Sequence, residues 1–271
     1  MNDLLLDAQR NNYAVGLFNT IDTDAIEAAI SAAEEMRAPI IIGTAEVLLP
    51  YGPLQLIGPS MIQTAKNATV PVAVHYDHGL TKEKCLEALQ LGFTSIMFDG
   101  SAGDEEDNIR LTCEMVEIAH EMGAHVEGEI GHVGTIGHDD ADCEDMYTTP
   151  EEAVNFVQAT GVDALAVAIG TAHGAYTKKP KLDIERLKAI RACLDTPLVL
   201  HGGSGLSDED FKNTIRNGVA KINIFTDLYV AGRKAIKECE GSYLEMRAEK
   251  VKAIKQVVIE KLQLFGSVGK G

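Results

Sequence analysis

Apolar runs of five to eight residues alternate with longer amphipathic stretches along nearly the whole chain. Short runs that are apolar on both faces are typical of buried parallel strands, and apolar residues spaced three or four apart are typical of amphipathic helices. The pattern predicts strands at 13–18, 39–44, 70–77, 94–99, 125–130, 164–169, 197–201 and 221–225. It predicts helices at 23–37, 52–67, 81–91, 104–122, 151–160, 183–194 and 207–217, and a helical remainder to about 265.

Polar residues at the expected helix starts support these boundaries. Asp22 and Asp24 precede or open one helix, and Asp208 and Glu209 lie in the first turn of another. Acidic side chains are favoured there because they face unpaired backbone N–H groups. Thr81 is predicted to cap the helix that follows the third strand.

Eight strands alternating with about eight helices predict an α/β protein with a single (β/α)₈ TIM barrel and a C-terminal helical extension. A doubly wound parallel sheet is the alternative, because it has the same alternation of elements. No linker or low-complexity segment divides the chain, so one domain is expected over residues 1–271.

Composition narrows the classes of partner. The formal net charge of −17 argues against nucleic acid or an anionic membrane as the main partner, since both favour a basic surface. The N-terminus shows no signal peptide, and no apolar run is long enough to cross a bilayer, which predicts a cytoplasmic protein. Five cysteines without a CxxC pair favour free thiols, so a bound metal would need His and carboxylate ligands.

Three histidines follow the ends of predicted strands. His78 ends the third strand after Asp77, His173 follows the sixth, and His201 ends the seventh. Each alone is compatible with an ordinary polar residue that caps neighbouring backbone groups. Because the carboxyl ends of all barrel strands meet at one face, together they match a catalytic zinc site with three protein ligands and an open position.

Two carboxylates also end strands, Asp99 on the fourth and Glu129 on the fifth. They are candidates for a further metal position, or equally for acceptors of backbone hydrogen bonds at the rim. The remaining histidines are interpreted as structural or solvated: His75, His120, His125, His132 and His138.

Strands seven and eight are followed by segments that suit an anion. Backbone N–H groups of a glycine-rich turn can hold a phosphate, although turns need glycine as often as phosphates do. The candidates are Gly202, Gly203, Ser204, Asn223, Ile224, Phe225 and Thr226, with Gly174 from the sixth loop. The glycine-dotted acidic segment 131–149 is long enough to predict a functional lid.

With these residues assembled, the sequence resembles the class II, zinc-dependent ketose-bisphosphate aldolases, which include fructose- and tagatose-bisphosphate aldolases. The resemblance spans nearly the whole chain and is carried by segments 13–19, 75–79, 98–101, 127–131, 170–174, 201–205 and 221–227.

The resemblance implies reversible, Zn²⁺-dependent cleavage of a ketose phosphate to dihydroxyacetone phosphate and an aldehyde. It implies His78, His173 and His201 as zinc ligands, Asp77 as general acid/base, and Asp99 and Glu129 as a second, exchangeable metal position. It implies substrate or phosphate contacts from the glycine-rich segments and Asn223 to Thr226 named above, together with Asn19 and, as a loose match, Arg247. Members are often activated by a monovalent cation, Na⁺ or K⁺, and are usually homodimers or homotetramers.

Several positions depart from the family pattern. The loop acid of the family is replaced or displaced in segment 131–140, where Asp139 and Asp140 are the candidate substitutes. Ser101 is followed by Ala102 instead of His, and the usual Gln-x-Ser has become Gly43, Thr44 and Ala45. The changes surround the substrate rather than the metal, so a ketose 1-phosphate or tagatose bisphosphate suits the chain as well as fructose 1,6-bisphosphate does. Two other functions stay open: a sugar-phosphate isomerase or epimerase that uses the same enediolate, and a non-catalytic sugar-phosphate binder.

Overall fold

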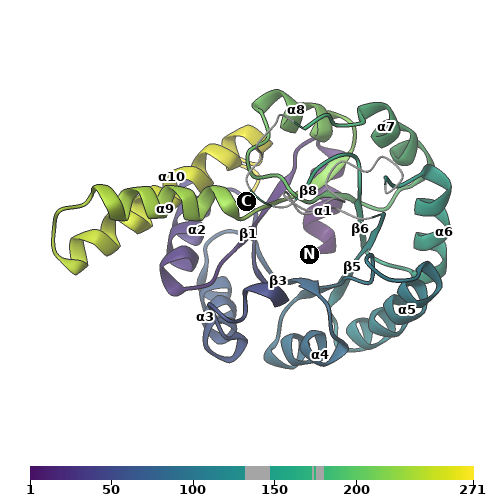
Figure 1. Ribbon diagram of the computed structural model, residues 1–271, viewed down its shortest axis with the longest axis horizontal. Coiled ribbons are helices and arrows are strands. Elements are labelled where there is room, and N and C mark those ends of the chain that lie inside the picture. The colour runs from purple at the N-terminus through teal and green to yellow at the C-terminus, as the bar shows by residue number, and fades with distance from the viewer. Residues whose placement is uncertain (132–146, 173, 175–179) are drawn as a thin grey trace.

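The computed structural model describes residues 1–131, 147–172, 174 and 180–271. Eight parallel strands form a closed barrel in the order β1 to β8, with helices around it (Figure 1). The strands are β1 (Val15–Asn19), β2 (Ile40–Ala45), β3 (Val72–Gly79), β4 (Ser95–Phe98), β5 (His125–Ile130), β6 (Ala164–Val167), β7 (Leu198–Leu200) and β8 (Val219–Ile224). The helices are α1 (Asn2–Arg10), α2 (Thr23–Met36), η1 (Glu46–Leu48), α3 (Leu54–Asn67), α4 (Lys82–Leu91), α5 (Glu105–Glu121), α6 (Pro150–Thr160), α7 (Ile184–Cys193), α8 (Asp208–Arg216), α9 (Thr226–Glu238) and α10 (Tyr243–Phe265).

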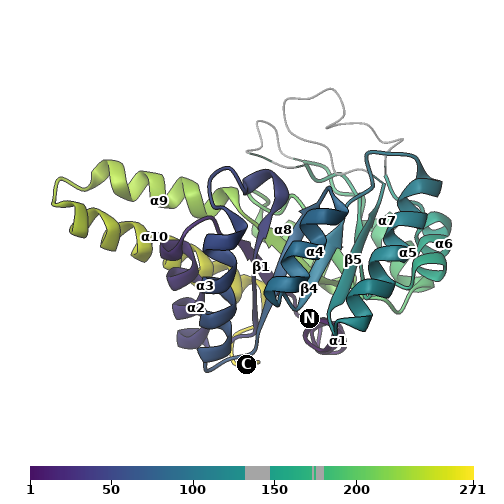
Figure 2. The same cartoon turned by 90° about the horizontal axis from the view of Figure 1, so that it is seen from below.

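The predicted TIM barrel with a C-terminal helical extension is confirmed, because β1 pairs with β8 and closes the sheet. A doubly wound sheet would leave two open edges, so that alternative is wrong. Helix α1 has no counterpart among the predicted elements. It lies across the amino ends of the strands (Figure 2), and its buried Leu5 and Ala8 pack with the lower interior of the barrel. Among the described helices, none combines the length and apolar character needed to span a membrane.

The barrel interior changes from apolar to charged along the strands. Successive side chains of a strand point to opposite faces, so residues two apart share the interior. On β3 these residues are Ala73, His75 and Asp77: Ala73 belongs to the apolar cluster above α1, whereas His75 and Asp77 are buried polar groups nearer the carboxyl ends. The apolar half supports the barrel, and the charged half leads to the candidate site.

The predicted helix starts are largely as expected. Asp22 accepts a hydrogen bond from the N–H of Ala25, and α8 begins with a capping box between Ser207 and Asp210. Thr81 precedes α4 as predicted, but its side chain makes no capping hydrogen bond, so that prediction is wrong. The hydroxyl donates instead to Glu46 of η1, 2.9 Å away, which supplies a stronger, ionised acceptor.

Gly43 of β2 allows this strand to approach β3 directly beneath the rim. A Cβ atom at this position would lie 2.4 Å from the backbone oxygen of His75. We expect Gly43→Ala to lower the free energy of unfolding by about 1–3 kcal/mol, because the two strands must move apart. Urea unfolding measures this loss. Gly123→Ala, where a Cβ meets nothing within 4 Å but the φ of +76° is strained, is the comparison for a pure backbone effect. Unchanged stability of Gly43→Ala would contradict the close packing.

Candidate active site

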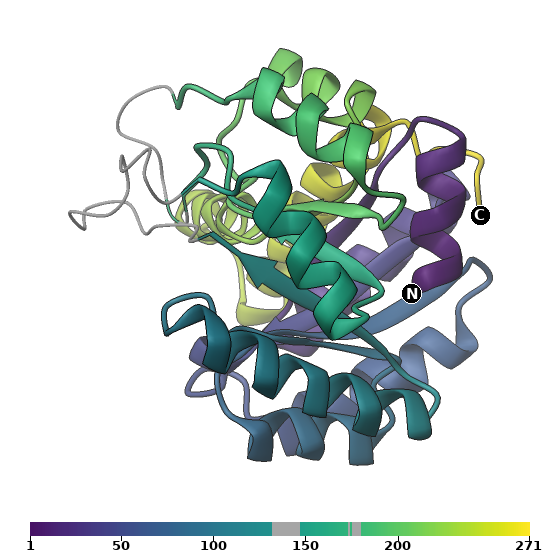
Figure 3. The same ribbon diagram turned by 90° about the vertical axis from the view of Figure 1, so that its right-hand side faces the viewer.

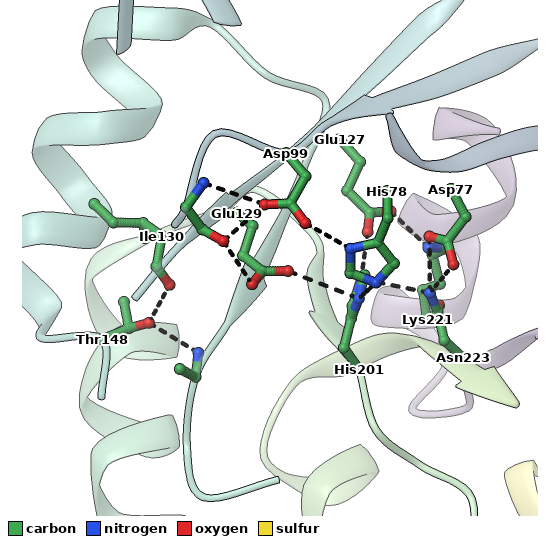
Figure 4. Close-up of polar contacts among 12 residues, drawn as sticks. Asp77, His78, Asp99, Glu127, Glu129, Ile130, Thr148, His201, Lys221 and Asn223 are labelled. Carbon is green, nitrogen blue, oxygen red and sulfur yellow. Dashed lines mark hydrogen bonds and ion pairs between the residues drawn. The ribbon is translucent and has the colours of Figure 1, made fainter. Parts of the chain in front are cut away.

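The metal-ligand candidates of β3 and β7 face each other at the carboxyl ends of the strands (Figure 4). His78 Nε2 lies 2.7 Å from His201 Nδ1, and the two rings meet edge to face with their centroids 4.5 Å apart. On the opposite side of its ring, His78 Nδ1 lies 2.7 Å from Asp99 Oδ2. This carboxylate favours the proton on Nδ1 and therefore turns Nε2 toward His201.

His78 holds an uncommon backbone conformation, with φ at +44°. A non-glycine residue in the left-handed region costs on the order of 1 kcal/mol or more and persists only where neighbouring contacts hold it. Glu46 supplies such contacts, because its Oε2 accepts from the backbone N–H of Leu80 at 2.9 Å and of Thr81 at 3.1 Å. Hydrogen bonds to Glu46 of η1 thus stabilise the turn that orients His78.

Asp77 lies in the barrel interior next to this pair and is 1% exposed. Asn19 Nδ2 donates to Asp77 Oδ2 at 2.7 Å, and Asn223 Nδ2 lies 3.0 and 3.1 Å from the two carboxylate oxygens. Burial alone would raise the pKa of Asp77, but the nearby charges of His78 and Lys221 lower it well below its usual range. The carboxyl group is therefore ionised and held from two sides.

Asp99 and Glu129 lie side by side at the rim and are connected through Ser101. The Ser101 hydroxyl lies 2.7 Å from Asp99 Oδ1 and 3.2 Å from Glu129 Oε1. Glu129 Oε2 also lies 3.7 Å from His201 Nδ1. His78, Asp99 and Glu129 thus form one compact group, and His78 also belongs to a second compact group with Asp77 and His201.

The candidate phosphate segments come together beside the histidines. Gly202 has a φ of +66°, and a Cβ there would lie 2.6 Å from the backbone oxygen of Ala172. The Ser204 hydroxyl accepts from the backbone N–H of Phe225 at 3.2 Å and of Asp227 at 3.4 Å, at the start of α9. The ends of β6, β7 and β8 therefore meet at the N-terminus of a helix, which is suited to an anion.

Several predicted site residues lie outside the part of the chain that the structure describes. His173, like His132, His138, Asp139 and Asp140, lies outside the described residues, as does most of the predicted lid. Gly174 is described and exposed, with a φ of +114°.

Arg247 lies on α10, where its guanidinium pairs with Asp24 at 2.8 Å and Glu27 at 2.6 Å. Both partners belong to α2, on the outside of the barrel. A role for Arg247 at a substrate phosphate stays a prediction.

Two charged residues of the site were named only as parts of family motifs and given no role. Glu127 Oε1 lies 2.8 Å from His201 Nε2, and its Oε2 lies 2.7 Å from Lys221 Nζ, in ion-pair contact without hydrogen-bond geometry. The period of two along a strand could have found them: Glu127 precedes Glu129 by two residues, and Lys221 precedes Asn223 by two.

The donor set fits a divalent metal. Two imidazole nitrogens that face each other at 2.7 Å, next to ionised carboxylates, are the nitrogen and oxygen ligands that zinc accepts. Each imidazole also has a carboxylate on its far nitrogen, as metal-bound histidines usually do. A barrel with this cluster at the carboxyl ends of its strands has the architecture of a metal-dependent TIM-barrel enzyme.

Comparison with known families agrees with this architecture. The sequence model of the family described as "Fructose-bisphosphate aldolase class-II" matches residues 1–270. The chain belongs to the class II fructose-bisphosphate aldolase family, whose members depend on a metal.

Individual relatives cover almost the whole chain. It is 43% identical over 266 residues to "Uncharacterized protein YdjI" of Escherichia coli, covering 97% of this chain and 96% of the relative. It is 38% identical over 281 residues to the "Fructose-bisphosphate aldolase" of Staphylococcus epidermidis, covering 98% and 96%. The crystal structure of the Escherichia coli YdjI aldolase superposes with a TM-score of 0.92 at 41% identity, covering 99% and 97%. The Campylobacter jejuni fructose-bisphosphate aldolase, with a TM-score of 0.83 at 22% identity and coverage of 100% and 95%, shares the fold.

Proposed function

We propose that this protein is a Zn²⁺-dependent aldolase that reversibly cleaves a ketose phosphate or bisphosphate to dihydroxyacetone phosphate and an aldehyde. The observation that carries the proposal is the compact group of Asp77, His78 and His201, in which two facing imidazole nitrogens lie beside a buried, ionised carboxylate. Family membership supports aldolase chemistry, and relatives named fructose-bisphosphate aldolase support a sugar phosphate as substrate.

His78, His201 and His173 would hold the zinc ion, and Asp99 and Glu129 would offer an exchangeable second position. When bound, zinc supplies a Lewis acid that stabilises negative charge developing at the substrate carbonyl. Asp99 also orients the His78 ring in the geometry described, so it serves the site in the absence of any second ion.

Asp77 acts as the proton carrier. In the cleavage direction its ionised carboxylate removes the proton from the hydroxyl on the carbon next to the breaking bond, and in the condensation direction it returns that proton. Asn19 and Asn223 hold the carboxylate from two sides, so its oxygens stay in one orientation. Their hydrogen bonds also favour the ionised form that accepts the proton.

The glycine-rich segment and the start of α9 bind the phosphate of dihydroxyacetone phosphate. Gly202, Gly203 and Ser204 form the turn, and Asn223 to Thr226 lead into the helix. Gly174 adds a further contact, and a monovalent cation, Na⁺ or K⁺, is expected near the bound phosphate charge.

A panel of ketose 1-phosphates and ketose bisphosphates tests the function. Formation of dihydroxyacetone phosphate is followed with a coupled dehydrogenase, for zinc-loaded protein and for protein treated with a chelator. We expect at least one substrate to be cleaved, with activity lost in the chelator and restored by zinc. Full activity in the chelator, with no metal retained, would contradict the zinc-dependent mechanism.

We also propose that the protein self-associates through the arm formed by α9 and α10. This arm projects from the side of the barrel (Figures 1 and 2), and Tyr243 and Leu244, which follow its turn, are 77% and 74% exposed. Residues 226–265 carry eight Lys or Arg and six Asp or Glu, whereas the whole chain has a net charge of −17. A second copy of this acidic chain therefore complements the arm in charge, and its own exposed apolar residues can cover the tip.

Replacing both tip residues tests this association. We expect Tyr243→Ser/Leu244→Ser to shift the wild-type oligomer toward monomer in sedimentation-velocity ultracentrifugation, because the exposed apolar tip loses its affinity for a partner. Val268→Ser, at another exposed apolar position, is the control and should leave the oligomer intact. A monomeric wild type, or an unchanged oligomer in the tip variant, would contradict the proposal.

A further inference from the structure

A fully buried ion pair lies behind His201 in the barrel interior. Glu127 of β5 and Lys221 of β8 are both 0% exposed, with 2.7 Å between Oε2 and Nζ (Figure 4). The other oxygen of Glu127 lies 2.8 Å from His201 Nε2. One carboxylate thus contacts both an ammonium group and the ring of a candidate metal ligand.

Packing alone does not explain this pair. Burying two charges is costly, and apolar residues of similar volume often stabilise a protein as well or better. The neighbouring interior shows that apolar filling suits this barrel, because Ala73, Val199 and Ala220 occupy its lower half. The charged pair therefore has a role that an apolar pair would not fulfil.

We infer that Glu127 and Lys221 are positioning residues that fix the ring of His201 so that Nδ1 faces the metal. The inference rests on the proposed metal site. Glu127 accepts a hydrogen bond from the Nε2–H of His201, and this tautomer leaves the lone pair on Nδ1, the nitrogen that faces His78 Nε2 at 2.7 Å. Lys221 holds the second oxygen of Glu127 and balances its charge, so the carboxylate does not turn away from the ring.

A carboxylate on the far ring nitrogen orients each of the two proposed ligand histidines, but the two carboxylates lie in different environments. Asp99 orients His78 through Nδ1 and is 13% exposed at the rim, where water reduces the cost of its charge. Glu127 orients His201 through Nε2 in the barrel interior, where both side chains are fully buried and the carboxylate charge needs a dedicated partner. This difference explains why a lysine accompanies Glu127.

Lys221 also lies against a second possible metal site, deeper in the barrel. This inner group consists of His75, Asp77 and Glu127, whose donor atoms lie close enough to hold an ion. The lysine ammonium already contacts Glu127 in this group and supplies its positive charge. We therefore expect the interior to need no metal of its own.

Three variants separate positioning from packing: Lys221→Met, Glu127→Gln and the double variant Glu127→Leu/Lys221→Met. Zinc affinity is measured by competition between the zinc-loaded protein and a chromogenic chelator, and stability by urea unfolding. Lys221→Met should lose stability, because it leaves the Glu127 charge unpaired, whereas the double variant should recover it. Zinc affinity of the double variant should stay about 10–100-fold below that of wild type, because His201 Nε2 has lost its acceptor.

Two further measurements sharpen the test. In ¹⁵N-labelled, zinc-loaded protein, long-range ¹⁵N–¹H correlation should show the Nε2–H tautomer of His201 in wild type and a changed ring signature in the double variant. Lys255→Met/Glu35→Gln removes a surface Lys–Glu pair of equal length, 2.7 Å, and should leave zinc affinity unchanged. If the double variant fails to fold, the zinc affinity of Glu127→Gln, which is nearly isosteric with wild type, tests the inference instead. We expect this affinity also to be below that of wild type.

Recovery of both stability and wild-type zinc affinity in the double variant would overturn the inference and leave the pair with a packing role. Wild-type zinc affinity in a folded Glu127→Gln variant, with an unchanged His201 signature, would overturn it too. A wild-type protein that binds no zinc would instead overturn the proposed metal site, so the two failures are distinguishable.

Discussion

Asp77→Ala is expected to lower the rate of carbon–carbon cleavage by about 10²–10⁴-fold while zinc stays bound. The loss follows from removing a buried carboxylate that lies beside both facing histidines and is held by Asn19 and Asn223. Steady-state kinetics on the best substrate of the panel gives the rate, and metal analysis of the same preparation gives the zinc content.

Asp107→Ala is the matched control, because this aspartate is 65% exposed on α5 and should leave both quantities unchanged. If Asp77→Ala cleaved substrate at the wild-type rate, another group would carry the proton. If it lost zinc as well, Asp77 would be a metal ligand.

His201→Ala is expected to lose both zinc and cleavage. His201 lies at the centre of the polar cluster, with Nδ1 toward His78 and Nε2 toward Glu127. Its removal deletes a proposed zinc ligand and the imidazole partner of Glu127 Oε1. Because metal affinity depends on the full ligand set, the variant should retain no zinc after dialysis against a weak chelator. Metal analysis and the cleavage assay are made on the same sample.

His120→Ala is the control for a general effect of removing a histidine. His120 is 43% exposed on α5 and pairs with Asp163 at 2.9 Å, away from the carboxyl ends of the strands. It should keep zinc and activity. A His201→Ala variant with wild-type zinc content would contradict its role as a ligand.

The sequence predicted the position of every strand, because each strand of a closed parallel barrel is buried on both faces and is therefore a continuous apolar run. The same rule predicted that β3, β4, β5 and β7 deliver His78, Asp99, Glu129 and His201 to one face, and the structure brings these four side chains together.

The charged interior was harder to predict from sequence. Glu127 and Lys221 lie within strands on β5 and β8, and 94 residues separate them in the chain. Nothing local shows which residue on another strand pairs with a given side chain, because that depends on the shear and closure of the barrel. His75 is similar: it was interpreted as structural, and its hydrogen bond to Ser95 on the adjacent strand appears only with the register of β3 and β4.

The helices near the two ends of the chain were predicted less completely than the strands. Helix α1 is short, and its apolar residues are buried only because the helix covers the amino ends of the barrel strands, at the right of Figure 3. The helical remainder predicted to about residue 265 is two helices, which separate at Cys239 to Ser242, where Ser242 begins α10 with a capping box. That box, with Glu245 three residues after Ser242, was visible in the sequence.

The identity of the products tests the proposed aldol cleavage most directly. Zinc-loaded protein is incubated with each ketose phosphate of the panel, and the reaction is followed by ¹³C and ³¹P nuclear magnetic resonance. We expect the signals of dihydroxyacetone phosphate and an aldehyde from at least one substrate, abolished by chelator and restored by zinc. A product that keeps all its carbons in one isomerised or epimerised sugar phosphate, or no turnover of any substrate with zinc bound, would contradict it.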